Sequence, residues 1–88
     1  MGLDELRAAI DGIDENIVRL LGRRADIAAR IGEEKRRDRG PLTDAEREEA
    51  VLKHVAAANR GPISEAALKE IYRRIIVACT DVQRTEEA

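Results

Sequence analysis

Residues 3–35 read LDELRAAIDGIDENIVRLLGRRADIAARIGEEK, and this stretch decides the fold. Its aliphatic residues recur at alternating spacings of three and four, which is typical of a helix that packs along one face. The residues of this face are Leu3, Leu6, Ile10, Ile13, Ile17, Leu20, Ile27 and Ile31. At 1.5 Å per residue the helix would be about 50 Å long, whereas a compact chain of this length has a radius of gyration of about 12 Å. A second copy of the chain would cover the protruding face, so we expect an intertwined homodimer.

Two cations share this apolar face. The spacing of the aliphatic residues also selects Arg24, and Lys35 falls only about 20° from Arg24 around the helix axis. Arg7 lies at the edge of the face, roughly 100° from Arg24. A guanidinium or ammonium on a buried face is costly unless an anion meets it. The face therefore predicts either structural ion pairs or a site for an anionic ligand.

The rest of the chain predicts two shorter helices. The sequence RRDRGP at residues 36–41 indicates that the first helix ends and that these arginines lie in a solvated loop. Thr43 and Glu46 form a capping-box pattern, which starts a second helix that continues to about Asn59. Ser64 is suited to cap the third helix. We expect an all-α chain of three helices, with one very long N-terminal helix, that forms a single domain over residues 1–88.

Polar residues also fall on the apolar faces of these shorter helices. Asp44 and Glu48 continue the face of the second helix, and Arg47 lies at its edge. In the third helix Gln83 lies four residues beyond Cys79, on the side of the apolar stripe. The short helices therefore add charge at positions where burial is expected.

Cations outnumber carboxylates among these residues, because Arg24, Lys35 and Arg47 face only Asp44 and Glu48. A buried structural salt bridge of Arg24 with one of the two carboxylates is the simpler interpretation. The surplus of cations instead favours a polyanionic ligand, and paired arginines suit carboxylates through bidentate hydrogen bonds.

The composition excludes several other classes of function. Tyr72 is the only aromatic residue and the net charge is −2, which argues against stacking of bases and against nucleic-acid binding. His54 is the only histidine, so a metal site has few ligands available. Cys79 is the only cysteine, which excludes an internal disulfide and fits a reducing compartment. No apolar run reaches the length of a membrane span, and we expect a cytoplasmic protein that needs no cofactor and binds no membrane.

The chain resembles the AroQ-class chorismate mutases over nearly its full length. The motifs that carry the resemblance are Leu6-Arg7, Ile13-Asp14, LLGRR at residues 20–24, IGEEK at residues 31–35, Pro41, DAERE at residues 44–48, and Gln83. Seven matches at these spacings across three helices make a specific pattern. The resemblance implies an all-helical homodimer that converts chorismate to prephenate without metal or cofactor.

The resemblance also implies how the two carboxylates of the substrate are bound. By this analogy Arg24 and Arg7 bind them, with Arg7 donated by the other subunit, and Arg47 lines the pocket. Independently, Arg7 and Arg24 are about 25 Å apart along one helix, a gap that no side chain closes within one molecule. Cys79 stands where the family commonly has a serine that touches a carboxylate, and a thiol is a weaker donor.

The remaining roles follow from the same resemblance. Lys35 and Gln83 would hydrogen-bond the ether oxygen of chorismate, and Glu48, together with Asp44, would accept the ring hydroxyl. These roles form an electrostatic site without a nucleophile, because the sequence has no histidine near a serine and no base beside Cys79.

Two other functions remain open at this point. An isochorismate pyruvate lyase on the same fold would share most of the cations, although Glu48 favours the mutase because it suits the 4-hydroxyl of chorismate. A non-enzymatic helical dimerisation module would also have the long apolar face. The family also occurs fused to, or activated by, other shikimate-pathway enzymes, so such a partner is a further expectation.

Overall fold

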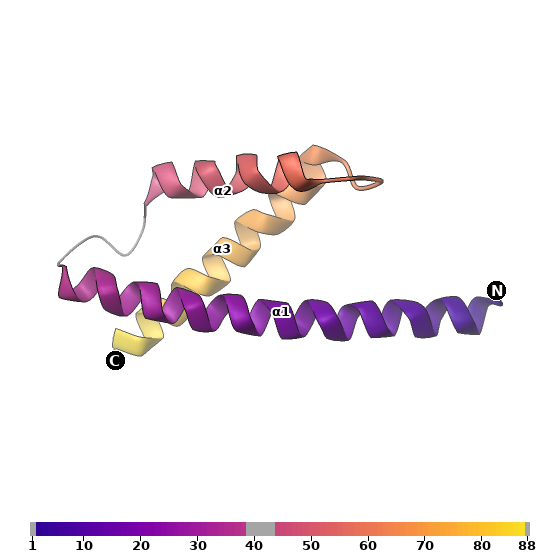
Figure 1. Ribbon diagram of the computed structural model, residues 1–88, viewed down its shortest axis with the longest axis horizontal. Helices are drawn as coiled ribbons and strands as arrows, with labels where there is room; N and C mark the ends of the chain where they lie inside the picture. Colours follow the sequence, from indigo (N-terminus) through magenta and orange to yellow (C-terminus); the bar gives the residue numbers. More distant parts are fainter. Residues whose placement is uncertain (1, 39–43, 88) are drawn as a thin grey trace.

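The computed structural model describes residues 2–38 and 44–87, which form α-helices joined by short connections (Figure 1). Helix α1 spans Leu3–Arg37, α2 spans Ala45–Ala58 and α3 spans Glu65–Glu87. No strand occurs among the described residues. The prediction of an all-α chain with one very long N-terminal helix is confirmed. None of the described helices combines the length and the apolar character needed to cross a membrane.

Helix α1 continues two residues further than the sequence indicated. Arg36 and Arg37 belong to its last turn, so the predicted loop was wrong for both, whereas the predicted exposure of Arg37 to solvent is confirmed. Arg37 pairs with Glu34 at 2.8 Å on the exposed surface, and Arg36 is half-buried against α3. Cations in the last turn are favourable because the carbonyl end of a helix carries partial negative charge. The predicted end of the helix at residues 39–41 lies outside the described residues.

The two shorter helices begin with side-chain caps. The Oδ1 atom of Asp44 accepts a hydrogen bond of 3.1 Å from the backbone N–H of Arg47. Asp44 is therefore the N-cap of α2, and the prediction of a cap at Thr43 was wrong by one position, although Thr43 itself lies outside the described residues. Aspartate is at least as good a cap as threonine, which explains the shift. The predicted cap of α3 is confirmed, since Ser64 Oγ accepts from the N–H of Ala67 at 3.1 Å.

A tight turn at Asn59 to Ile63 reverses the chain between α2 and α3. Asn59 Oδ1 accepts from the N–H of Gly61 at 2.8 Å, and Asn59 Nδ2 donates to the carbonyl of Ile63 at 2.7 Å. Gly61 has a φ of +74°, a left-handed conformation that glycine adopts without steric cost. This turn directs α3 back toward α1.

Helix α3 joins the other two helices. It packs against both α1 and α2, whereas α1 and α2 do not pack against each other within the described part of the chain. Figure 1 shows α3 running obliquely between them, with the N-terminal half of α1 extending away alone. The molecule measures 54 × 25 × 15 Å and its radius of gyration is 15.9 Å, compared with about 12 Å for a compact chain of this length.

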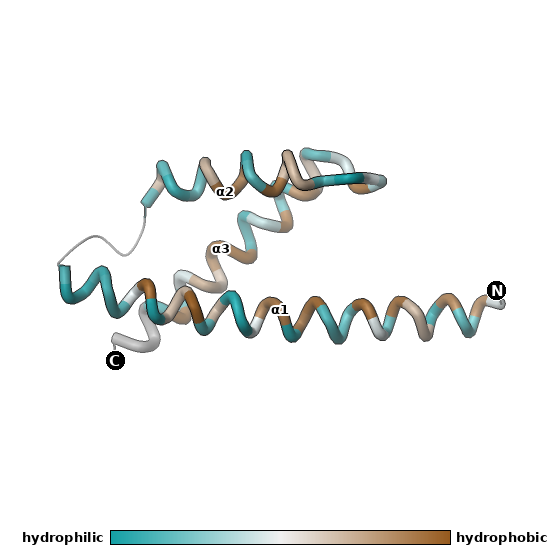
Figure 2. The backbone as a smooth tube through the Cα atoms, viewed as in Figure 1, coloured by the Kyte–Doolittle hydropathy of each residue, from teal (hydrophilic) through white to brown (hydrophobic). Residues whose placement is uncertain are grey.

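A single chain buries very little apolar surface. Among the described residues only Ala28, Leu52 and Cys79 are buried apolar residues, and no large side chain is fully buried. Apolar residues recur along the free half of α1 in Figure 2, and all of them are exposed. These exposed residues include Leu3, Leu6, Ile10, Ile13, Ile17 and Leu20. The expected homodimer would cover this surface, and it remains a prediction.

Candidate active site between the three helices

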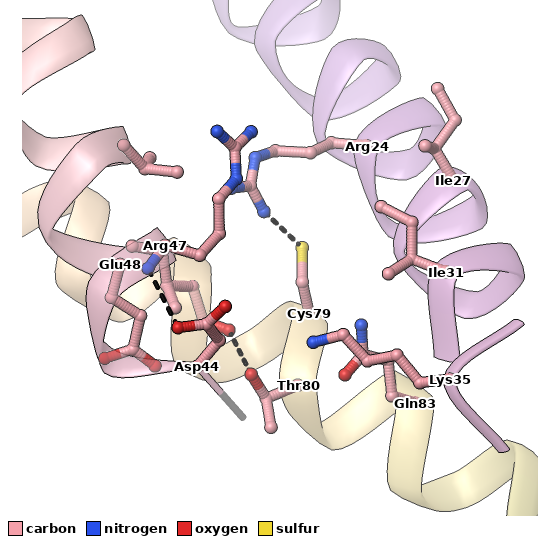
Figure 3. Close-up of a pocket in the computed structure, with 12 residues that line it drawn as sticks. Arg24, Ile27, Ile31, Lys35, Asp44, Arg47, Glu48, Cys79, Thr80 and Gln83 are labelled. Atoms are coloured by element: carbon pink, nitrogen blue, oxygen red, sulfur yellow. Dashed lines mark hydrogen bonds between the residues drawn. The ribbon is translucent and has the colours of Figure 1, made fainter. Parts of the chain in front are cut away.

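A pocket of about 240 Å³ lies between the C-terminal half of α1, the start of α2 and the end of α3 (Figure 3). Its position follows from the packing, because α1 and α2 both contact α3 but not each other in the described structure. Seven of the eight site residues predicted from the sequence line this pocket. They are Arg24, Lys35, Asp44, Arg47, Glu48, Cys79 and Gln83. The eighth, Arg7, is exposed and does not line it.

Arg24 is held by a thiol rather than by a carboxylate. Its Nη1 atom donates to Cys79 Sγ at 3.0 Å, and Arg24 is half-buried while Cys79 is buried. No ion pair joins Arg24 to Asp44 or Glu48 among the described residues, so the structural salt bridge considered above is not formed. A guanidinium has five N–H donors, and the single bond to sulfur leaves most of them available to a ligand.

The first turn of α2 forms the opposite wall of the pocket. Asp44, Arg47 and Glu48 all lie there (Figure 3). The Oδ1 atom of Asp44 caps the helix. Glu48 is half-buried and is the carboxylate with fewer hydrogen bonds within the described part of the chain. An acceptor in this position suits a hydroxyl group of a ligand.

Gln83 lies at the end of the pocket formed by α3 and is one of the most buried polar residues. Only 7% of its surface is exposed. Its Nε2 atom donates to the backbone carbonyl of Ala28 at 2.9 Å. Its Oε1 atom is buried and has no hydrogen-bond partner among the described residues. Lys35, which is half-buried, extends into the pocket next to this amide (Figure 3).

Several other residues line the pocket that were not predicted as site residues. They are Ile27, Ile31, Val51, Ile76 and Thr80. The hydroxyl of Thr80 donates to the carbonyl of Ile76 at 3.0 Å. Ile76, Thr80 and Gln83 are spaced by four and three residues, so the helical period could have indicated the two additional residues of α3.

Comparison with known proteins identifies the family. Residues 6–84 match the chorismate mutase type II family. The chain belongs to this family. Within the chorismate mutase type II family, the chain is 42% identical over 86 residues to the bifunctional chorismate mutase/prephenate dehydratase of Aquifex aeolicus. It is 40% identical over 86 residues to the bifunctional protein of the same description from Neisseria gonorrhoeae.

These alignments cover 93% of this chain but only 24% and 23% of the two relatives. The chain therefore spans about a quarter of the length of the curated relatives it matches. The resemblance to AroQ-class chorismate mutases is thus confirmed at the level of the family.

Solved structures of chorismate mutases have the same fold. The enzyme of Thermus thermophilus in its form II superposes with a TM-score of 0.91 and 28% identity, covering 93% of each chain. The enzyme of Helicobacter pylori in complex with prephenate superposes with a TM-score of 0.86 and 26% identity, covering 94% of this chain and 90% of that one.

Proposed function

We propose that this chain is a chorismate mutase that converts chorismate to prephenate. The observation that carries the proposal is the pocket in which Arg24, Lys35 and Arg47 outnumber the carboxylates of Asp44 and Glu48. Net positive charge in a half-buried pocket suits a small dicarboxylate, because guanidinium groups bind carboxylates through charge-assisted hydrogen bonds. The family and the relatives named above support the same substrate.

The reaction requires restraint and electrostatic stabilisation rather than a nucleophile. It breaks a C–O bond and forms a C–C bond within one molecule, so no proton transfer and no cofactor is needed. Arg24 would hold one carboxylate of the substrate and thereby keep its side chain over the ring, which lowers the entropic part of the barrier. Lys35 and Gln83 would stabilise the negative charge that develops on the ether oxygen.

The magnitudes show that the electrostatic stabilisation is not sufficient alone. Enzymatic accelerations begin near 10⁶, which corresponds to about 8 kcal/mol. A hydrogen bond to a charged group contributes roughly 1.5–3 kcal/mol. Lys35 and Gln83 together therefore fall short of the total, and the conformational restraint must supply the rest.

Each remaining residue has a proposed role that agrees with its position. Glu48 accepts the ring hydroxyl, with Asp44 contributing to the same wall, and Arg47 lines the pocket beside them. Cys79 aligns Arg24 through the bond to its Sγ atom, which replaces the serine contact to substrate expected from the family. A weak acceptor is sufficient for this alignment because it competes little with the carboxylate.

We further propose that the active unit is a homodimer in which each pocket receives Arg7 from the partner chain. Two observations support this arrangement. Leu6 and Ile10, on either side of Arg7, are exposed in the single chain, with 48% and 59% of their surface accessible. Arg7 itself lies about 25 Å along α1 from Arg24, so only an antiparallel second helix brings the two together.

The context of the domain is also a proposal. Residues 1–88 would form a single mutase domain, and the bifunctional relatives illustrate how such a domain can be joined to an enzyme that consumes prephenate. A cytoplasmic location is supported by the free thiol of Cys79, since reducing compartments keep thiols unpaired.

Incubation of the purified chain with chorismate and, separately, with isochorismate tests the proposed function. We expect prephenate from chorismate and no pyruvate from isochorismate. Release of pyruvate without formation of prephenate would instead identify a lyase on this fold. If neither product forms, while chorismate fails to protect the dimer against heat, a non-enzymatic dimerisation module is the better description.

A further inference from the structure

Gly32 is the glycine of α1 at which another helix approaches closely. A Cβ atom placed on it would lie 3.1 Å from Cγ and 3.2 Å from Cβ of Gln83, tighter than ordinary van der Waals contact. Gly12 and Gly22, on the same helix, have no such neighbour within 4 Å. A glycine inside a helix is destabilising relative to alanine. The contact with Gln83 therefore explains why a glycine is placed at this position.

The carbonyl of Ala28, one turn before Gly32, fixes the orientation of the Gln83 amide. Nε2 of Gln83 donates one hydrogen to this carbonyl at 2.9 Å. The reversed amide would place its oxygen against the carbonyl oxygen, where two acceptors repel each other. The observed orientation leaves the second Nε2 hydrogen for a ligand, while Oε1 is buried without a partner among the described residues.

A third contact joins the backbone of α3 to the same segment of α1. Nη1 of Arg36 donates to the backbone carbonyl of Gln83 at 3.5 Å, which is a long hydrogen bond. We call the Ala28 carbonyl, Gly32 and Arg36 the Gln83 seat. All of its members lie within the last three turns of α1. The seat thus holds both the main chain and the side chain of Gln83 against one surface.

We propose that Gly32 is a positioning residue for the rearrangement, because its missing side chain lets the Gln83 seat present the amide to the pocket in one fixed orientation. This inference rests on the proposed function, in which Gln83 donates to the ether oxygen of the substrate. Displacement of a reacting group by about 1 Å can lower a rate by about 100-fold. A Cβ at position 32 displaces Gln83 by a few tenths of an ångström, enough to disturb a transition-state contact.

The first experiment compares Gly32→Ala with Gly12→Ala as a matched control. Both variants gain the helix propensity of alanine, but only Gly32→Ala pushes against Gln83. We expect Gly32→Ala to lower kcat about tenfold, with KM changed by less than about twofold, because the contact acts in the transition state. The control should retain the kcat of the wild type. An unchanged kcat in a folded Gly32→Ala variant would overturn the positioning role and leave the mutase function intact.

The second experiment asks whether Gly32 acts through Gln83. In a Gln83→Ala background the additional Gly32→Ala substitution should change kcat by less than about twofold, since the amide it would displace is already absent. If the tenfold loss persists in that background, Gly32 supports the helix in general and the proposal is wrong.

The third experiment observes the seat without any enzymatic assay. Gln83 is the only glutamine, and the only asparagines are Asn16 and Asn59, so side-chain amides give three resonance pairs in a ¹⁵N spectrum. We expect a Gln83 amide proton to exchange with water at least tenfold more slowly than those of exposed Asn16. Exchange as fast as that of Asn16 would refute the seat, even if Gly32→Ala fails to fold. Absence of prephenate from the wild type would refute the function alone.

Discussion

Arg24 occupies the middle of an apolar helix face, and its surroundings show why a cation is tolerated there. The thiol of Cys79 accepts one of its hydrogens at 3.0 Å, and no carboxylate pairs with it among the described residues. A buried guanidinium that is neutralised by a salt bridge has little affinity left for a ligand, whereas one held by sulfur keeps its charge available. The residue thus combines fixed orientation with an unneutralised charge.

Lys35 provides the first prediction at this scale. Lys35→Ala should lower kcat about 100-fold or more while KM changes much less, because the ammonium acts on charge that is largest in the transition state. Steady-state kinetics on chorismate measure both constants. Lys53→Ala is the matched control, since Lys53 is exposed on α2 and lines no part of the pocket. A steep rise in KM with unchanged kcat would show that Lys35 only binds a carboxylate.

Gln83→Glu provides the second prediction. The new carboxyl would face the carbonyl of Ala28 in a site where 7% of the residue is exposed. Burial and the opposing oxygen raise its pKa, while the nearby ammonium of Lys35 lowers it. We expect the first two effects to dominate and to bring the pKa above the usual value of about 4.3. Only the protonated form can donate a hydrogen bond to the ether oxygen. The activity of this variant should therefore fall as pH rises through the raised pKa.

The free energy of unfolding of Gln83→Glu should also fall as pH rises. A carboxyl whose folded-state pKa is raised favours the folded state below its unfolded pKa, and this contribution is lost as pH rises through the folded value. Rate–pH profiles of the variant and the wild type, measured side by side, test the predicted loss of activity. Identical profiles would remove Gln83 from the reaction.

At the scale of helices, the periodicity of the sequence was sufficient to predict which residues share a face. Arg24 and Lys35 were predicted from the period of α1, and Gln83 from its spacing to Cys79, and all of them line one pocket. Periodicity describes one helix at a time, however. The contact of Gly32 with Gln83 depends on the register between α1 and α3, which no single-helix pattern contains.

Two predictions failed because the local sequence is compatible with more than one structure. Thr43 and Asp44 are adjacent, and both residue types cap helices, so the sequence could not decide which one begins α2. Arg36 resembled a solvated cation because its neighbours are charged, but it lies within the helix and reaches the backbone of Gln83. The position of Arg36 thus depends on a tertiary contact, which the local sequence does not contain.

The cap of α3 gives a prediction at this scale. Ser64→Ala removes the acceptor for the N–H of Ala67 and should lower the free energy of unfolding by about 1 kcal/mol. Ser64→Gly is the matched comparison and should cost only a few tenths of a kcal/mol, because glycine is itself tolerated at this position. Denaturant unfolding at one fixed protein concentration measures both. An unchanged free energy of unfolding in Ser64→Ala would show that the hydroxyl does not stabilise the helix.

At the scale of the whole molecule, one chain buries little apolar surface. Its buried apolar residues among those described are two small residues and one leucine, while large aliphatic side chains along α1 are exposed. Burial of apolar surface is the main favourable contribution to folding. A partner chain on α1 would therefore contribute stability and, through Arg7, complete the pocket.

The most direct test of this shared site mixes two inactive variants. Arg7→Ala and Glu48→Ala should each be nearly inactive as homodimers. If they are refolded together in equal amounts, about half of the dimers are mixed. In the proposed arrangement Arg7 acts in the partner's pocket and Glu48 in its own, so one pocket of a mixed dimer would carry both lesions and the other neither.

The control pairs Glu48→Ala with Lys35→Ala, whose lesions lie in the pocket of the same chain, so every mixed dimer has two damaged sites. We predict that the first mixture recovers about a quarter of wild-type activity and that the control mixture recovers none. Verified mixed dimers of Arg7→Ala and Glu48→Ala that remain inactive would contradict the account, because Arg7 would then not complete the pocket of its partner.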